Sequence, residues 1–151
     1  MSRVVFVPLL MIATCSQNET PAIDAAAPVA AAAPVMVENP TKVGECAERT
    51  IAEIGVSYAD GPNDRLPSKR PKPGKDRGSY VRYTNKDTQV SREWNAALAH
   101  SKVGDRVRMC LVSFPKDCPP GDNRGRVHET TNLRTNESWT MQDDPHMCGG
   151  A

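Results

Sequence analysis

The fold of this chain is decided by the stretch Asp105-Arg106-Val107-Arg108-Met109-Cys110-Leu111-Val112-Ser113. Apolar and polar residues alternate along it, and a period of two is typical of a β-strand with one buried face. The alternation places Val107, Met109 and Leu111 on the core face and the two arginines outward. We therefore predict a mainly β domain that contains this strand.

Strand patterns also occur before and after this stretch. Residues 46–58 predict a strand that is broken by Gly55, and residues 79–84 and 88–91 predict a hairpin. A strong turn follows at Pro119-Pro120-Gly121-Asp122, and residues 126–133 and 138–141 predict two more strands. In these last two strands we expect three packing residues, which are Val127, Leu133 and Trp139.

A short helix is predicted over residues 92–100, with Ser91 as its N-cap. Trp94, Ala97 and Leu98 are spaced three and four apart there, which places them on one helix face. Only 5% of the residues are aromatic, so Trp94 and Trp139 are expected to dominate the core area. The predicted fold class is mainly β with one short helix, a small barrel or sandwich-like α+β domain.

The chain has five cysteines, and Cys15 differs from the other four in its surroundings. An even number of cysteines in a small exported domain indicates disulfides. The favoured pairing is Cys46–Cys110 with Cys118–Cys148, and the main rival is Cys110–Cys118 with Cys46–Cys148. Each bridge would stabilise the domain by roughly 2–4 kcal/mol.

The N-terminus has the features of an export signal. Residues 1–14 carry one positive charge and a short apolar run, which predicts a signal peptide. Ile12-Ala13-Thr14-Cys15 resembles the bacterial lipobox, which implies a lipid anchor on Cys15 and attachment to a membrane. Because Ser16 replaces the Asp of an inner-membrane retention signal, we expect an outer-membrane lipoprotein that faces the periplasm or the surface. The alternative is a cut near residues 25–27 and a soluble periplasmic or secreted protein.

The rest of the chain divides into a tether and a domain. Residues 15–40 contain Ala-Ala-Ala-Pro-Val twice, and the prolines favour a semi-extended, disordered tether. Residues 41–151 form the predicted domain. It includes a long basic loop at 60–78 that is interrupted by prolines. The loop is either a solvated insertion or a binding segment for an anionic envelope partner, through the cations Arg65, Lys69, Arg70, Lys72, Lys75 and Arg77.

Charge and motifs limit the possible functions. Removing the leader removes Arg3 and leaves 18 basic and 18 acidic residues, a balance that disfavours a general nucleic-acid binder. The absence of a Cys-x-x-Cys pair disfavours a zinc site, so we predict no metal and no cofactor; no pattern sets an oligomeric state. The favoured function is a non-enzymatic binding module for a protein or polysaccharide. The alternative is a small hydrolase or lyase acting on envelope polymers or nucleic acid, with His128, Arg126 and Arg134 as candidate catalytic residues.

One resemblance covers much of the predicted domain. It rests on segments 103–113, 117–122, 131–135 and 146–151, which include Asp117-Cys118-Pro119-Pro120-Gly121-Asp122 and His146-Met147-Cys148-Gly149-Gly150-Ala151. Together with the lipobox-like leader, these segments resemble a group of small proteobacterial envelope lipoproteins. The resemblance implies an exported, disulfide-linked β domain and no particular reaction. The layout is also similar to that of bacterial lysozyme-inhibitor lipoproteins, without a shared inhibitory motif.

Overall fold

The structure is a computed structural model that describes residues 33–58, 60 and 64–150. The predicted signal peptide and Cys15 lie outside the described residues. The described part contains strands β1 to β7, a single turn of helix α1 and a 3₁₀ turn η1. Their bounds are β1 Val35–Met36, β2 Glu45–Gly55, β3 Ser79–Tyr83, β4 Thr88–Ser91, α1 Ala96–Ala99, β5 Arg106–Ser113, β6 Val127–Asn132, β7 Ser138–Gln142 and η1 Cys148–Gly150.

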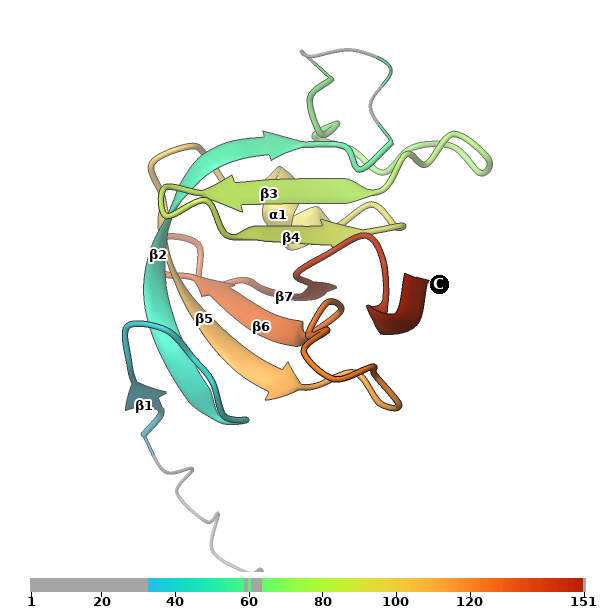
Figure 1. Ribbon diagram of the computed structural model, residues 1–151. Helices are drawn as coiled ribbons and strands as arrows, with labels where there is room; N and C mark the ends of the chain where they lie inside the picture. The colour runs from blue at the N-terminus through green and yellow to red at the C-terminus, as the bar shows by residue number, and fades with distance from the viewer. Residues whose placement is uncertain (1–32, 59, 61–63, 151) are drawn as a thin grey trace, which may run out of the picture. The chain divides into compact units, whose positions relative to one another are not determined.

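Six of the strands form a closed barrel (Figure 1). The sheet order is β1-β2-β3-β4-β7-β6-β5, and β5 also pairs with β2, which closes the ring. β2, β3 and β4 are joined by consecutive connections, and β5 returns to the free side of β2, which is the arrangement of a Greek key. All pairings within the ring are antiparallel. The prediction of a mainly β domain with one short helix is confirmed, and its form is the small barrel.

The long strand β2 makes closure possible because it belongs to both sides of the ring. Its first half pairs with β5 at Cys46 to Thr50, and its second half pairs with β3 from Ile51 onward. The register shifts between Ile51 and Glu53, and such a bulge bends a strand and increases its twist. β1 runs parallel to the start of β2 and forms an outer edge. It falls within residues 15–40, where the sequence predicts a tether.

The interior of the barrel is apolar on most strands. Val107, Met109 and Leu111 of β5 are buried, as their alternation predicts. The main cluster also contains residues from β2, β3, β7 and α1, namely Ile51, Val81, Tyr83, Ala97, Leu98, Trp139 and Met141. Trp139 is therefore a core residue, as expected.

Strand β6 differs from the prediction because its polar residues face the interior. His128, Thr130 and Asn132 are buried, whereas Val127 is only partly buried and Leu133 is 44% exposed. The assignment of Val127 and Leu133 as packing residues is wrong. The alternation holds, but its inward phase belongs to the polar set, and the side chains of Thr130 and Asn132 find hydrogen-bond partners inside.

The helix is shorter than predicted. α1 covers Ala96–Ala99 only, and its N-cap is Asn95, whose side chain accepts a hydrogen bond from the Leu98 amide. Ser91 instead ends β4, so its assignment as the N-cap is wrong. Trp94 precedes the helix, is only partly buried and is not part of the main cluster. Within the described part of the chain, no helix has the length and apolarity needed to cross a membrane.

Both favoured disulfides are confirmed. Cys46 and Cys110 are directly opposite each other on β2 and β5, and their sulfurs are bonded. Cys118 and Cys148 join the segment before β6 to η1. The first bridge lies in the barrel wall and the second ties down two segments outside it.

Candidate functional site

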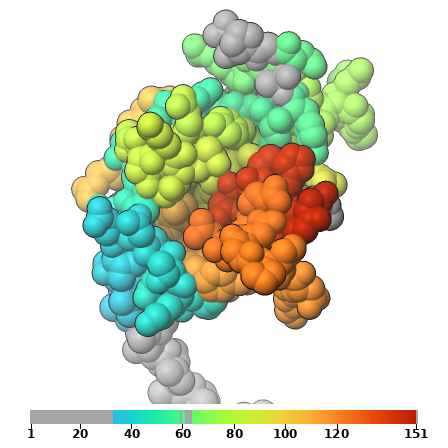
Figure 2. Space-filling view, viewed as in Figure 1, coloured from blue at the N-terminus to red at the C-terminus, as the bar shows by residue number. Residues whose placement is uncertain are grey.

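A cavity lies where four connecting segments meet, and we call it the His128 cavity. Its volume is about 650 Å³. The walls come from the connection before β2, the β3–β4 turn, the segment before β6 and the segment after β7. Met109 and His128 reach it from the barrel interior. In Figure 2 the surrounding segments are blue at residues 35–45, yellow-green at the β3–β4 turn, and orange to red near the C-terminus.

Ion pairs line this cavity. Arg49 Nε lies 3.0 Å from Asp87 Oδ2, and the Arg49 side chain is only 8% exposed. Its Nη2 also donates to the Glu38 carbonyl at 2.9 Å, which ties the connection before β2 to the β3–β4 turn. A nearly buried guanidinium needs such partners, because an unpaired buried charge is strongly unfavourable. Arg49 therefore fixes one wall of the cavity.

Two further ion pairs line the cavity. Arg126 Nε lies 2.6 Å from Asp143 Oδ2, and Arg124 Nη2 lies 2.7 Å from Asp122 Oδ2. The hydrogen bonds from Arg124 hold the pKa of Asp122 well below its ordinary value. Asp143 also accepts a hydrogen bond from the Gly125 amide at 2.9 Å. The segment before β6 is thus bonded to the segment after β7.

His128 is the unusual group of the cavity. It is 4% exposed, and its Nδ1 is buried without a hydrogen-bond partner among the described residues. Burial lowers the pKa of His128; Asp143 raises it by a smaller amount, and Arg126 lowers it further. The imidazole is therefore neutral at pH 7. A buried polar atom without a partner is rare in native proteins and calls for an explanation.

A buried hydrogen-bond network adjoins His128 inside the barrel. The Gln89 carbonyl Oε1 accepts from Tyr83 OH at 2.6 Å, from Trp139 Nε1 at 2.9 Å and from Thr130 Oγ1 at 3.0 Å. Gln89 itself is fully buried, and its amide donates to the His128 carbonyl at 3.5 Å. Burial raises the pKa of Tyr83 far above its ordinary value, so its hydroxyl stays a donor. The network satisfies the polar groups next to His128 and leaves only the ring unpaired.

The Cys118–Cys148 bridge supports the cavity from outside. It connects the ends of two segments that contribute Asp122 and Asp143 to the walls. The Gly149 amide also donates to Asp122 Oδ2 at 3.1 Å. A covalent and a polar link therefore hold the same two segments together.

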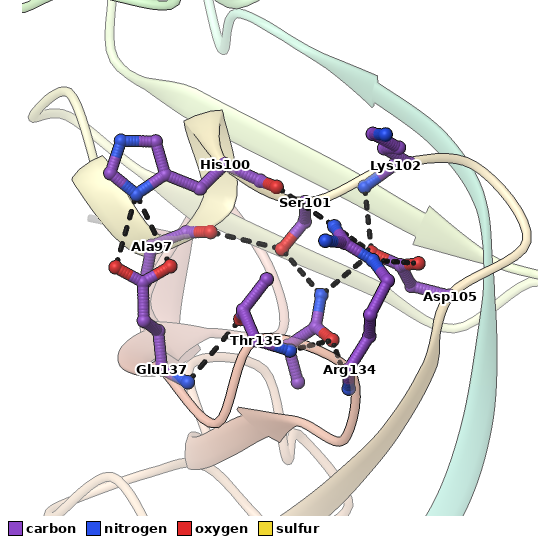
Figure 3. A network of polar contacts seen from close by, with 9 residues as sticks. Ala97, His100, Ser101, Lys102, Asp105, Arg134, Thr135 and Glu137 are labelled. Carbon is purple, nitrogen blue, oxygen red and sulfur yellow. Dashed lines mark hydrogen bonds and ion pairs between the residues drawn. The ribbon is translucent and has the colours of Figure 1, made fainter.

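The structure brings only two of the three candidate catalytic residues together. Arg126 and His128 both line the cavity, but Arg134 follows the other end of β6. There Arg134 binds Asp105 through two hydrogen bonds of 2.7 and 2.8 Å and donates to the His100 carbonyl at 2.9 Å (Figure 3). These bonds hold the pKa of Asp105 well below its ordinary value. Arg134 thus joins the helix end to the β6–β7 turn.

Two other polar residues of β6 also lie away from the cavity. Glu129 is exposed, because neighbouring residues of a strand point to opposite faces. Asn132 is buried beside Asp105, to which its Nδ2 donates at 2.8 Å. Neither side chain lines the His128 cavity.

The basic loop is partly attached to the domain. Arg77 binds Asp64 at 2.8 Å and Asp60 at 3.1 Å, and Leu66 packs against the core cluster. Trp94 Nε1 donates to the Pro67 carbonyl at 2.9 Å. The remaining cations form no ion pair with a described residue and are exposed, namely Arg65, Lys69, Arg70, Lys72 and Lys75. The loop therefore presents five available positive charges on an anchored base.

Sequence reasoning missed most of the cavity residues. Arg49, Asp87 and Asp143 come from three different segments, and no motif connects them. The one usable signal was the polar phase of β6, which contains His128. In the described residues, no group of three His, Cys, Asp or Glu side chains could hold a metal ion.

Comparison with known proteins gives no relative. No protein-family model, no curated protein and no solved structure matches the chain.

Proposed function

We propose that this protein is an exported, non-enzymatic binding module whose ligand site is the His128 cavity. The observation that carries the proposal is the imidazole of His128, which is nearly buried, lines the cavity and has no partner of its own. Ligand pockets combine a concave shape with a few unsatisfied polar groups that fix the ligand's orientation. The partner would be a protein or a polysaccharide of the envelope.

The state of the ionisable groups favours binding over catalysis. General acid–base chemistry needs a group that is free to exchange a proton with the substrate. Three of the four cavity carboxylates, Asp87, Asp122 and Asp143, are each held in an ion pair with an arginine. They serve as wall contacts in this proposal.

A hydrolase or lyase is the second candidate, because Arg126 and His128 share the cavity. In that case His128 would act as the base and Arg126 would stabilise an anion. Asp143 would then have to release Arg126, to which it is bonded at 2.6 Å.

One experiment separates the two candidates. The purified chain is immobilised and exposed to fractionated envelope polysaccharide and protein. The molecular mass of the retained component is measured before and after its incubation with the chain. A binding module returns it at unchanged mass, whereas a hydrolase or lyase returns shorter products. Asn123→Trp, which fills the cavity from an exposed wall position, should abolish retention. Thr140→Trp on the outer face of β7 is the matched control and should retain the component; equal retention by both variants refutes the proposal.

The basic loop is a second candidate surface, for an anionic partner. Its support is the five cations without ion pairs, beside a domain that is otherwise charge-balanced. Exposed charges of this kind attract polyanions at low salt. This surface is distinct from the His128 cavity and could act together with it.

Export and anchoring complete the proposal. The two disulfides fit an exported protein, because such bridges persist in oxidising compartments. We further propose that Cys15 carries lipid and holds the domain at the outer membrane. Mass spectrometry of the mature N-terminus tests this. A diacylated or triacylated Cys15 is expected, and an unmodified N-terminus near residue 25 refutes the anchor.

A further inference from the structure

The two ring nitrogens of His128 differ in their access to the cavity. Neither has a hydrogen-bond partner among the described residues, and only Nδ1 is shut away from solvent. His128 lines the cavity, so Nε2 is the nitrogen that the cavity can reach. No neighbouring side chain imposes one tautomer on the His128 ring. Nε2 can therefore either donate or accept a hydrogen bond.

The charges around the cavity cancel. Its lining contains four cationic side chains and four acidic ones: Arg49, Lys86, Arg124 and Arg126, and Asp87, Asp122, Asp143 and Asp144. Each of the three arginines is bonded to one of the aspartates at 2.6–3.0 Å. An anionic ligand would have to compete with these aspartates for the guanidinium groups. The lining thus favours a ligand without net charge.

The chemistry of a neutral imidazole narrows the ligand further. Burial lowers the pKa of His128, so at pH 7 the ring offers one donor and one acceptor and no charge. A hydroxyl group both donates and accepts, and it can match Nε2 in either tautomer. A carboxylate only accepts and an ammonium only donates. Around the ring, the polar wall groups offer further partners to additional hydroxyls.

We propose that the His128 cavity binds the end of a neutral oligosaccharide, which is an uncharged, polyhydroxylated ligand. In this proposal, which rests on the binding function proposed above, a sugar hydroxyl is hydrogen-bonded to His128 Nε2. The volume of about 650 Å³ lies within the range of small-ligand pockets, roughly 300–1,000 Å³. His128 is then the residue that determines specificity for hydroxyl groups.

The test is titration calorimetry of the full chain with defined probes. The neutral probes are maltotetraose and tetra-N-acetylchitotetraose, the anionic probe is tetragalacturonate, and the peptide probe is an uncharged tetrapeptide. We expect a neutral sugar to bind more tightly than the other two. His128→Leu should weaken that binding at least tenfold, and His128→Gln, which keeps an amide near the Nε2 position, should stay within about threefold of the wild type. His146→Leu is the matched histidine control outside the cavity and should change nothing.

Folding of the variants is checked by thermal melting. His128→Leu should melt at the same or a higher temperature than the wild type, because it removes the unpaired Nδ1. A binding loss in a variant that stays folded then supports the proposal. Equal losses in His128→Leu and His128→Gln refute the hydrogen bond to Nε2.

The outcomes also separate this inference from the proposed function. One outcome is that tetragalacturonate or the peptide binds, that Asn123→Trp abolishes this binding, and that neither neutral sugar binds. In that case the proposed ligand class is wrong, but the binding function stands. If the envelope component is retained equally by Asn123→Trp, the binding function itself is wrong.

Discussion

At the scale of single residues, Gln89 is the residue on which the polar interior depends. Its carbonyl accepts hydrogen bonds from Tyr83, Thr130 and Trp139, all within the closed barrel. We expect Gln89→Leu to lower the free energy of unfolding by about 3 kcal/mol or more, because each unpaired buried donor costs about 1–3 kcal/mol. Urea unfolding measures this loss.

The matched control for Gln89 is on the outside of the same barrel. Thr140→Leu places leucine at an exposed position of β7 and should change the free energy of unfolding by no more than about 0.5 kcal/mol. A loss below about 1 kcal/mol for Gln89→Leu would show that the three donors find other partners.

The Arg134–Asp105 pair gives a prediction for acid stability. The folded-state pKa of Asp105 lies below its ordinary value, so the unfolded chain binds the proton more readily. Its contribution to stability is therefore complete above the ordinary pKa and is lost as pH falls through the folded-state pKa. Asp105→Asn should lower stability at pH 7 by about 2 kcal/mol, the order expected for hydrogen bonds to a charged group.

The measurement is urea unfolding at pH 7, 5, 4 and 3. The difference between Asp105→Asn and the wild type should shrink as the pH falls from 4 to 3, because the unfolded wild-type chain then binds a proton at Asp105 that the folded state does not bind. Asp117→Asn, at an exposed carboxyl without a hydrogen bond, should follow the wild type throughout. If the difference in free energy of unfolding stays constant with pH, the charge of Asp105 is not what stabilises its contact with Arg134.

Residue-scale sequence reasoning succeeded where burial follows hydrophobicity and failed where it does not. The alternation of β5 correctly placed Val107, Met109 and Leu111 inside. In β6 the same period holds, but His128, Thr130 and Asn132 occupy the interior. The burial of Thr130 and Asn132 depends on partners that come from distant parts of the chain, namely Gln89, Ser101 and Asp105. A single strand's sequence does not show these partners.

At the scale of elements, the basic loop consists of an anchored base and a free tip. Leu66 packs on the core and Trp94 donates to the Pro67 carbonyl, so the base of the loop is not a purely solvated insertion. Replacing residues 68–74 with two glycines should leave the melting temperature nearly unchanged. Leu66→Ala should lower the free energy of unfolding by about 1–2 kcal/mol, less than for a fully buried leucine.

The same loop variant tests the anionic partner. Shortening residues 68–74 removes Lys69, Arg70 and Lys72, so binding to vesicles that contain anionic lipid should weaken at low salt. Binding by the wild type should also fall on raising the salt, because exposed charges are screened beyond about 10 Å at 0.1 M. Vesicle binding that is unchanged by both treatments would leave the loop without this role.

The helix shows why element bounds could not be predicted well. Ser91 and Asn95 are both good N-cap residues, and the sequence favoured the first. Ser91 is instead used by β4, which pairs with β3 at Ser79. Asn95 is left to cap a single turn, Ala96–Ala99, held mainly by the buried Leu98. Competition between a strand and a helix for the same residue is decided by tertiary pairing.

At the scale of the whole molecule, closure of the barrel was not predictable from periodicity. Alternation identified β3 to β7 but could not choose between a sandwich and a barrel, because the choice depends on β2 pairing with both β3 and β5. The disulfide pairing was the better long-range signal. Cys46–Cys110 correctly joined β2 to β5, which is the contact that closes the ring.

The two bridges should therefore differ in what they support. They span 64 and 30 residues of sequence, and the chain-entropy relation gives about 4.3 and 3.6 kcal/mol for loops of these lengths. Cys46 is also buried, so Cys46→Ala/Cys110→Ala should lose more stability in urea than Cys118→Ala/Cys148→Ala. The second pair holds segments that carry Asp122 and Asp143. Its loss should therefore weaken ligand retention by the His128 cavity at temperatures where both variants are folded. The opposite result would contradict this assignment. In that case the variant without Cys118–Cys148 would be the less stable one, and only the variant without Cys46–Cys110 would lose ligand retention. The barrel wall, and not the outer bridge, would then shape the cavity.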